Sequence, residues 1–150
     1  MLFDRRRGLR LPAFMLLIAA AALAGCNGGD LAGAPSSGLT CVDDSPECVG
    51  RRQRTLRYLV EAEDHAWVKA HAPAEAYASG VRLFAMQKKK KQLSCDELAH
   101  ARNEADQAPR VLRGPQGKNL TPAQVSRGVM LASEVSRELG AEMRRRCNRG

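Results

Sequence analysis

The feature that most constrains this chain is its first 25 residues, which are typical of a segment that is removed before folding. Arginines at positions 5, 6, 7 and 10 precede an almost unbroken apolar run over residues 11–23. This order of charge and apolar segment is typical of a secretory signal peptide. A permanent membrane-spanning helix is the alternative, but about a dozen apolar residues fall short of the roughly 20 that a bilayer requires. The fold must therefore be built from the residues that follow.

The end of this leader carries a more specific signal. In Leu23-Ala24-Gly25-Cys26, small residues stand directly before a cysteine. The stretch resembles the lipobox of bacterial lipoproteins, and the resemblance covers the leader only. It implies cleavage before Cys26, attachment of two or three acyl chains to the Cys26 sulfur, and insertion of these chains into a lipid bilayer. Because each buried methylene contributes about 0.8 kcal/mol, an anchor with more than one chain is stable.

The residue after the cysteine bears on location. In the Gram-negative sorting rule, aspartate at that position retains a lipoprotein in the inner membrane, whereas this chain has Asn27. The resemblance therefore implies the periplasmic face of the outer membrane. The arginine cluster also bears a faint similarity to a twin-arginine export signal. The aromatic residue expected after the arginines is missing, which favours the general secretory route.

Residues 26–40 are predicted to form the lipidated cysteine and a flexible tether. The stretch NGGDLAGAPSSGLT over residues 27–40 is rich in Gly, Ser, Ala and Pro and has no periodicity. A coil of this length spans about 20 Å, which would lift the domain clear of the lipid head groups. Residues 41–150 then form the body, which is long enough for one domain with a modest core but not for two.

The charge of the mature chain is compatible with anionic partners. Removal of the four arginines and one aspartate of residues 1–25 lowers the net charge from +8 to +5. Such a balance suits phospholipid or lipopolysaccharide head groups, and it equally suits an ordinary soluble surface. The export signal argues against a nucleic-acid partner. Two clusters would carry binding to an anionic surface: Lys88, Lys89, Lys90 and Lys91, and Arg144, Arg145 and Arg146.

Four cysteines of the body predict disulfides, because an exported protein lies in an oxidising compartment. They are Cys41, Cys48, Cys95 and Cys147, and three pairings are possible. We expect Cys41 to pair with Cys48 in a short local loop, and Cys95 to pair with Cys147. A metal site is the alternative, but the spacing contains no C-x-x-C and exported cysteines are usually oxidised. We therefore expect neither a metal ion nor a cofactor.

Helix signals dominate the body and predict an all-α domain, a small irregular bundle of about four helices. Ser45-Pro46 predicts a helix that begins at residue 46 and ends between residues 65 and 70. A second helix should run from residue 74 to the lysine cluster, with Tyr77, Val81 and Phe84 on one face. Residues 80–86 could instead form a short strand, but no partner strand is evident.

The last two predicted helices should pack against each other. Ser94 and Glu97 have the form of a capping box, and they predict a third helix from residue 95 that ends before Pro109. Residues 110–119 should be a loop. A fourth helix is predicted over residues 122–146, with one apolar stripe: Val125, Val129, Ala132, Val135, Leu139 and Met143. Antiparallel packing of these two helices would bring Cys95 and Cys147 together.

Motifs for catalysis are scarce, and no catalytic site is predicted. The chain has no G-x-S-x-G, no H-E-x-x-H and no phosphate-binding glycine loop. Asp96 and His100, and likewise Glu61 and His65, are four residues apart, a spacing more typical of surface contacts than of a site. We expect a non-enzymatic envelope lipoprotein that binds another envelope protein or a cell-wall component. The alternative is a basic membrane-surface module that binds anionic lipid or lipopolysaccharide head groups.

Overall fold

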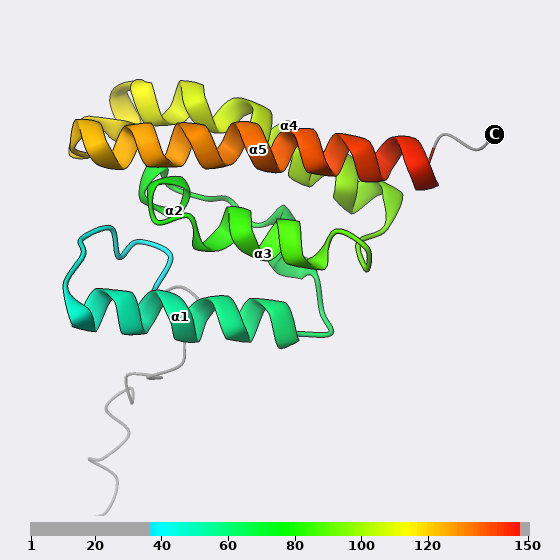
Figure 1. Ribbon diagram of the computed structural model, residues 1–150, viewed down its shortest axis with the longest axis horizontal. Helices are drawn as coiled ribbons and strands as arrows, with labels where there is room; N and C mark the ends of the chain where they lie inside the picture. The colour runs from blue at the N-terminus through cyan, green and yellow to red at the C-terminus, as the bar shows by residue number, and fades with distance from the viewer. Residues whose placement is uncertain (1–36, 148–150) are drawn as a thin grey trace, which may run out of the picture. The chain divides into compact units, whose positions relative to one another are not determined.

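The computed structural model describes residues 37–147, so the leader, Cys26 and residues 27–36 of the predicted tether lie outside the described residues. The described chain is an all-α bundle, as the sequence predicts, and this part contains no strand. Its helices are α1 (Pro46–Glu61), η1 (Ala66–Lys69), α2 (Ala74–Ala78), α3 (Val81–Lys89), α4 (Cys95–Arg113), η2 (Pro115–Gly117) and α5 (Pro122–Arg146). Helix α3 lies between α1 and α5, and α4 packs along α5 (Figure 1).

The described chain already packs against the bundle before the predicted start of the domain at residue 41. The backbone N–H of Gly38 donates to the buried Thr55 Oγ1 on α1 at 3.1 Å. Leu39 packs against both apolar clusters of the core. Gly38 and Leu39, at the end of the stretch predicted as a tether, therefore contact the bundle.

Helix α1 begins as predicted but ends earlier. The Ser45 hydroxyl accepts from the Cys48 N–H at 3.2 Å, and Pro46 occupies the first turn. The helix ends at Glu61 rather than between residues 65 and 70, because the backbone of Ala62 leaves the helical conformation with φ −58° and ψ 130°. The Ala62 carbonyl accepts from the Lys89 ammonium at 2.8 Å. This contact holds the end of α1 against α3 and lets the following residues form the separate turn η1.

The second predicted helix is in fact two helices, because Gly80 breaks it. Gly80 has φ 77°, a left-handed conformation that side chains rarely adopt, and α2 ends before it while α3 begins after it. The strand alternative for residues 80–86 is wrong. Tyr77 and Val81 are buried but Phe84 is exposed, so the prediction that the three lie on one face is wrong for Phe84.

Helix α4 runs through Pro109 to Arg113, so the predicted end before Pro109 and the loop over residues 110–119 are corrected. A proline inside a helix costs about 3 kcal/mol. The extra turn buries Leu112 and partly buries Val111 against the core. Full burial of one leucine contributes about 1.5–3 kcal/mol. Together with the partial burial of Val111, it offsets the cost of the proline.

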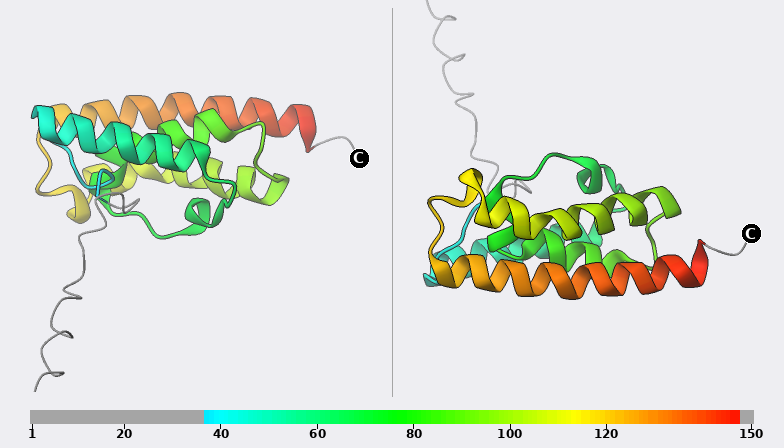
Figure 2. Two further views of the ribbon diagram at one scale, coloured as in Figure 1. Left: turned by 90° about the horizontal axis from the view of Figure 1, so that it is seen from below. Right: turned by 90° about the horizontal axis from the view of Figure 1, so that it is seen from above.

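The antiparallel packing of α4 and α5 is confirmed, and so is its disulfide. The two helices lie side by side in both views of Figure 2. Cys95 and Cys147 form a disulfide with their Cα atoms 5.8 Å apart, and Cys41 pairs with Cys48. The α5 stripe is buried or packed against the core at each of its six predicted positions. The capping boxes before α4 and α5 form as predicted.

Candidate functional site

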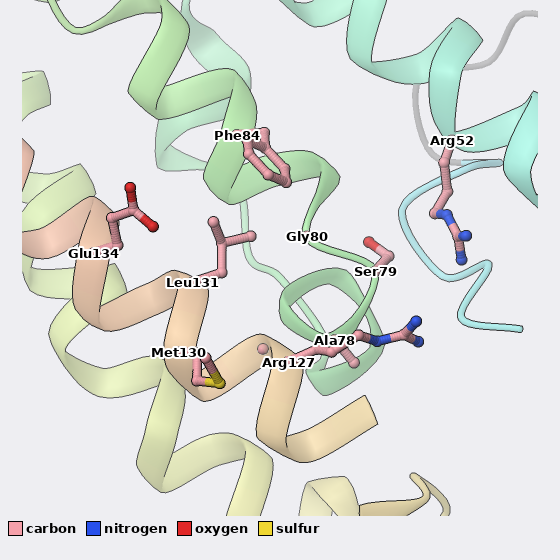
Figure 3. A pocket seen from close by; sticks show the side chains of 10 residues that line it. Arg52, Ala78, Ser79, Gly80, Phe84, Arg127, Met130, Leu131 and Glu134 are labelled. Carbon is pink, nitrogen blue, oxygen red and sulfur yellow. The ribbon is translucent and has the colours of Figure 1, made fainter. Parts of the chain in front are cut away.

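An open groove beside α3 and α5 is the best-formed candidate site of the described chain. Its volume is about 420 Å³, and it is lined by residues of α1, the α2–α3 junction, α3 and α5. Phe84 and Leu131 form its apolar wall, with Met130 at its edge (Figure 3). We call it the apolar groove; its remaining lining residues are Arg52, Ala78, Ser79, Gly80, Arg127, Gly128 and Glu134.

The apolar groove gathers exposed apolar side chains. Three large hydrophobic residues of the described chain are exposed: Met130 at 71%, Tyr58 at 50% and Phe84 at 41%. Two of the three line the groove. Large apolar side chains grouped on a surface mark binding sites more often than isolated ones do. Methionine suits such a site because its flexible side chain adapts to different partners.

Two glycines give the groove its form. A Cβ atom at Gly80 would lie 2.9 Å from the Leu131 side chain, so only glycine lets the α2–α3 junction approach α5 this closely. A Cβ atom at Gly128 would lie 2.7 Å from Leu112 Cδ1 and 3.2 Å from the Tyr77 carbonyl oxygen. The side of α5 that carries Gly128 therefore rests directly on α2 and α4, and Met130 and Leu131 are fixed along the groove.

The two ends of the groove differ in charge. At one end, Arg127 donates to both oxygens of Asp44 at 3.1 and 3.2 Å, and Arg52 contacts the same carboxylate at 3.4 Å. Hydrogen bonding to Arg127 lowers the pKa of Asp44, so this carboxyl is charged at neutral pH. Glu134 stands on the opposite side of the apolar wall (Figure 3). No ion pair joins Glu134 to another residue within 37–147.

The structure brings the two predicted cationic clusters to one end of the bundle. Arg146 donates to the backbone carbonyls of Lys90 at 3.1 Å and Lys91 at 2.9 Å, which joins the end of α5 to the end of α3. Several of the cations are already occupied by the chain's own acceptors. The pairs are Lys89 with the Ala62 carbonyl, Lys90 with Glu138, and Arg145 with Glu142.

The side chains of Lys88, Lys91 and Arg144 are the cations of these clusters that remain exposed and have no partner in the described chain. The hydrogen bond from Arg145 lowers the pKa of Glu142, and that from Lys90 lowers the pKa of Glu138. Both carboxylates therefore offset part of the positive charge at neutral pH. An anionic surface would meet a smaller excess of charge here than the seven residues imply.

A second, polar cleft of about 430 Å³ lies between η1, α2 and α4. Glu104, one of its lining residues, is held in an ion pair: Arg82, 2% exposed, donates to both oxygens of Glu104. Arg82 also donates to the carbonyls of Trp67, Val68 and Ala70 at 2.6, 3.0 and 2.7 Å. The pair thus holds η1 on the bundle, and both Glu104 oxygens accept from the guanidinium.

Tyr77 and His100 complete the polar cleft. Burial, aided by the charge of Glu104, raises the pKa of Tyr77 to about 12, so its phenol is neutral at physiological pH. His100 lies with Nε2 3.9 Å from Glu104 Oε2 rather than beside Asp96, the neighbour that its spacing also allowed. The cleft therefore offers hydrogen-bonding groups, but the carboxylate that could act as a base is held by Arg82.

The other predicted residues occupy structural positions. His65 lies with Nδ1 3.5 Å from Glu97 Oε2, rather than pairing with Glu61. Asp43 and the sulfurs of Cys41 and Cys48 lie within 4.8 Å of one another, a spacing that could hold a metal ion. Both sulfurs are joined in the disulfide, so they provide no thiolate ligand. None of the helices within 37–147 is both long and apolar enough to cross a bilayer.

Comparison of the chain with protein-family models, with curated proteins and with solved structures found no match.

The apolar groove was not predicted from the sequence. Its residues come from segments that are far apart in the chain, such as Arg52 on α1 and Met130 on α5. The signal that could have indicated it is the position of Met130 and Leu131, which lie outside the apolar stripe of residues 122–146. Large apolar residues off the stripe of a surface helix are candidates for an interface.

Proposed function

We propose that this chain is a non-enzymatic envelope lipoprotein, anchored through an acylated Cys26, whose helical domain binds another envelope protein in the apolar groove. The observation that carries the binding role is the exposure of both Met130 and Phe84 in one groove of about 420 Å³. The lipobox stretch and the two disulfides support the envelope location, because disulfides persist in oxidising compartments.

The groove is a better candidate for this role than the polar cleft. A partner that covers its exposed apolar area removes that area from water, which stabilises the complex by about 25 cal/mol per Å². The carboxylate that lines the polar cleft, Glu104, is already satisfied, because Arg82 donates to both of its oxygens and also to three backbone carbonyls of η1 and the residues after it. A ligand there would compete with contacts that hold η1. This comparison favours protein binding over capture of a small cell-wall fragment.

Photocrosslinking in cells that express the full chain tests the proposal. We would place a benzophenone side chain at position 130 or, as the matched control, at position 58, since Met130 and Tyr58 are both exposed apolar residues and only Met130 lines the groove. We expect a crosslinked protein from position 130 alone, and its loss on Phe84→Ser. Equal crosslinking from both positions, or crosslinking that Phe84→Ser leaves unchanged, would contradict a role for the groove.

The second candidate function is binding of the bundle end to anionic lipid or lipopolysaccharide. The contacts of Arg146 with the backbone of Lys90 and Lys91, which bring the two cationic clusters together, favour it. Binding of vesicles that contain anionic lipid should fall steeply as salt rises from 0.05 to 0.5 M, since charged contacts are screened at about 10 Å in 0.1 M salt. The triple variant Lys88→Ala, Lys91→Ala, Arg144→Ala should bind anionic vesicles as weakly as the unaltered chain binds neutral vesicles.

A further inference from the structure

At the cationic end of the apolar groove, Arg127 and Arg52 have N–H groups that donate to no acceptor within residues 37–147. Arg127 uses only Nη1 on Asp44, so its Nη2 and Nε remain available within residues 37–147. Arg52 uses Nη1 on the carbonyls of Cys41 and Asp43 and Nη2 on Asp44, which leaves its Nε. Two guanidinium groups thus share the Asp44 carboxylate, and Arg127 keeps charged N–H groups that suit a second carboxylate.

The other end of the groove, at Glu134, suits a cationic group of a partner. Glu134 is exposed and has no cationic partner among the described residues. Arg127 and Glu134 are seven residues apart on α5, which is about 10.5 Å along the helix axis at 1.5 Å per residue. Phe84, Met130 and Leu131 fill the space between them (Figure 3). The groove therefore presents a positive charge, an apolar wall and a negative charge in that order.

A second helix laid along α5 has the same rise per residue, so its positions i and i+7 would face Arg127 and Glu134, and its positions i+3 and i+4 would face the apolar wall. An extended segment has no comparable fit, because the described bundle offers no strand edge on which it could pair. The geometry thus favours a helix as the occupant.

Resting on the proposed function, we propose that the partner segment is an amphipathic helix with a carboxylate at one position, apolar side chains three and four residues later, and a lysine or arginine seven residues later. The order of acid before base places the partner helix parallel to α5. It is also the order that the partner's own dipole favours, because acids stabilise the first turns of a helix and bases the last.

Fluorescence anisotropy with synthetic peptides tests this inference on the full chain purified in detergent. We would use four labelled helical peptides with one apolar face, which differ only at the two positions seven residues apart: Glu with Lys, Glu with Glu, Lys with Lys, and Gln with Gln. The Glu–Lys peptide should bind about fivefold more tightly than either like-charged peptide in low salt. This preference should disappear in 1 M salt, where screening acts within about 3 Å.

Two charge reversals in the groove provide the decisive control. Glu134→Lys should shift the preference to the Glu–Glu peptide, because both ends of the groove then carry cations. Arg127→Glu should shift it toward the Lys–Lys peptide. Glu63→Lys makes the same charge change at an exposed position outside the groove and should leave the wild-type order unchanged. Glu134→Lys removes no contact of the described fold, so its result is not confounded by misfolding.

Three results would overturn the proposal. They are equal binding of all four peptides, no binding of any peptide, and dimerisation of the full chain that Met130→Lys abolishes, since the last would assign the groove to a second copy. If crosslinking from position 130 in cells persists while the peptides fail to bind or to discriminate, the groove binds a partner of other chemistry and only this inference fails. If that crosslinking is also absent, the proposed function fails with it.

Discussion

Glu104→Gln is the substitution that most directly tests how the bundle is held together. Arg82 is buried, and Glu104 is its one carboxylate partner in the described chain. Glutamine keeps the size of the side chain but removes its charge, so the guanidinium stays buried without a counter-charge. Loss of one partner of a buried ion pair costs about 3–5 kcal/mol. We expect about 3 kcal/mol, because the glutamine oxygen still accepts one hydrogen bond and three backbone carbonyls still hold Arg82.

Arg82→Met should be more severe than Glu104→Gln. It leaves the Glu104 carboxylate unpaired and also removes the donors to the carbonyls of Trp67, Val68 and Ala70. At about 1 kcal/mol for each lost hydrogen bond, the total approaches 6 kcal/mol. Because small domains unfold with about 5–15 kcal/mol, this variant should be close to unfolded at room temperature.

Urea and thermal denaturation followed by far-ultraviolet circular dichroism measure both effects. A loss of about 3 kcal/mol lowers the melting temperature by about 12 °C in a domain of this size. Glu134→Gln is the matched control: it makes the same chemical change at an exposed residue and should alter stability by less than about 0.5 kcal/mol. If Glu104→Gln is no more destabilising than Glu134→Gln, the buried pair does not stabilise the position of η1 and the reasoning is wrong.

Three further predictions concern the anchor, the disulfide and the buried tyrosine. Cys26→Ser should abolish incorporation of a fatty-acid analogue in cells, and undiminished labelling would refute the lipid anchor. Replacing Cys95 and Cys147 together by alanine should cost about 4 kcal/mol in urea denaturation, since their disulfide closes a long loop, and an unchanged midpoint would contradict this. In Tyr58→Phe, Tyr77 is the remaining tyrosine, and its absorbance titration should have a midpoint near 12, against its ordinary 10.0. Because the pKa of Tyr77 is raised in the folded state, the neutral phenol contributes to the free energy of unfolding in full below pH 10, and this contribution is lost as the pH rises through 12. A midpoint near 10 would show that Tyr77 is not held neutral by burial.

Local chemistry explains why most of the helices were predictable. A capping box uses residues three apart in the chain, so Ser94 with Glu97 and Thr121 with Gln124 fix the starts of α4 and α5 whatever packs on them. The disulfide between Cys95 and Cys147 followed from those two starts and one apolar stripe. The end of α4 was wrong because it depends on a tertiary contact, the burial of Leu112, that outweighs the local cost of Pro109.

The cationic clusters show a second limit of sequence reasoning. Charge is visible in the sequence, but its neutralisation is not, because the acceptors come from other segments. Lys90 meets Glu138 across 48 residues, and Lys89 meets the Ala62 carbonyl across 27. Both lysines close α3 as expected for cations at the negative end of a helix dipole. Both lysines therefore contact acceptors within the fold, which leaves less of their charge for an anionic surface.

The apolar groove could not be predicted because two residues without side chains determine it. Periodicity places Phe84 on the same face as Tyr77 only if residues 74–89 form one helix. The left-handed backbone at Gly80 breaks that helix, and Phe84 lies exposed along the groove. Gly128 then lets α5 rest on α2 and α4, since a Cβ atom there would lie 3.2 Å from the Tyr77 carbonyl oxygen and 2.7 Å from Leu112. An alanine at Gly128 would push α5 away from α2 and shift Met130 relative to Phe84, so the shape of the proposed interface depends on the core contact behind it.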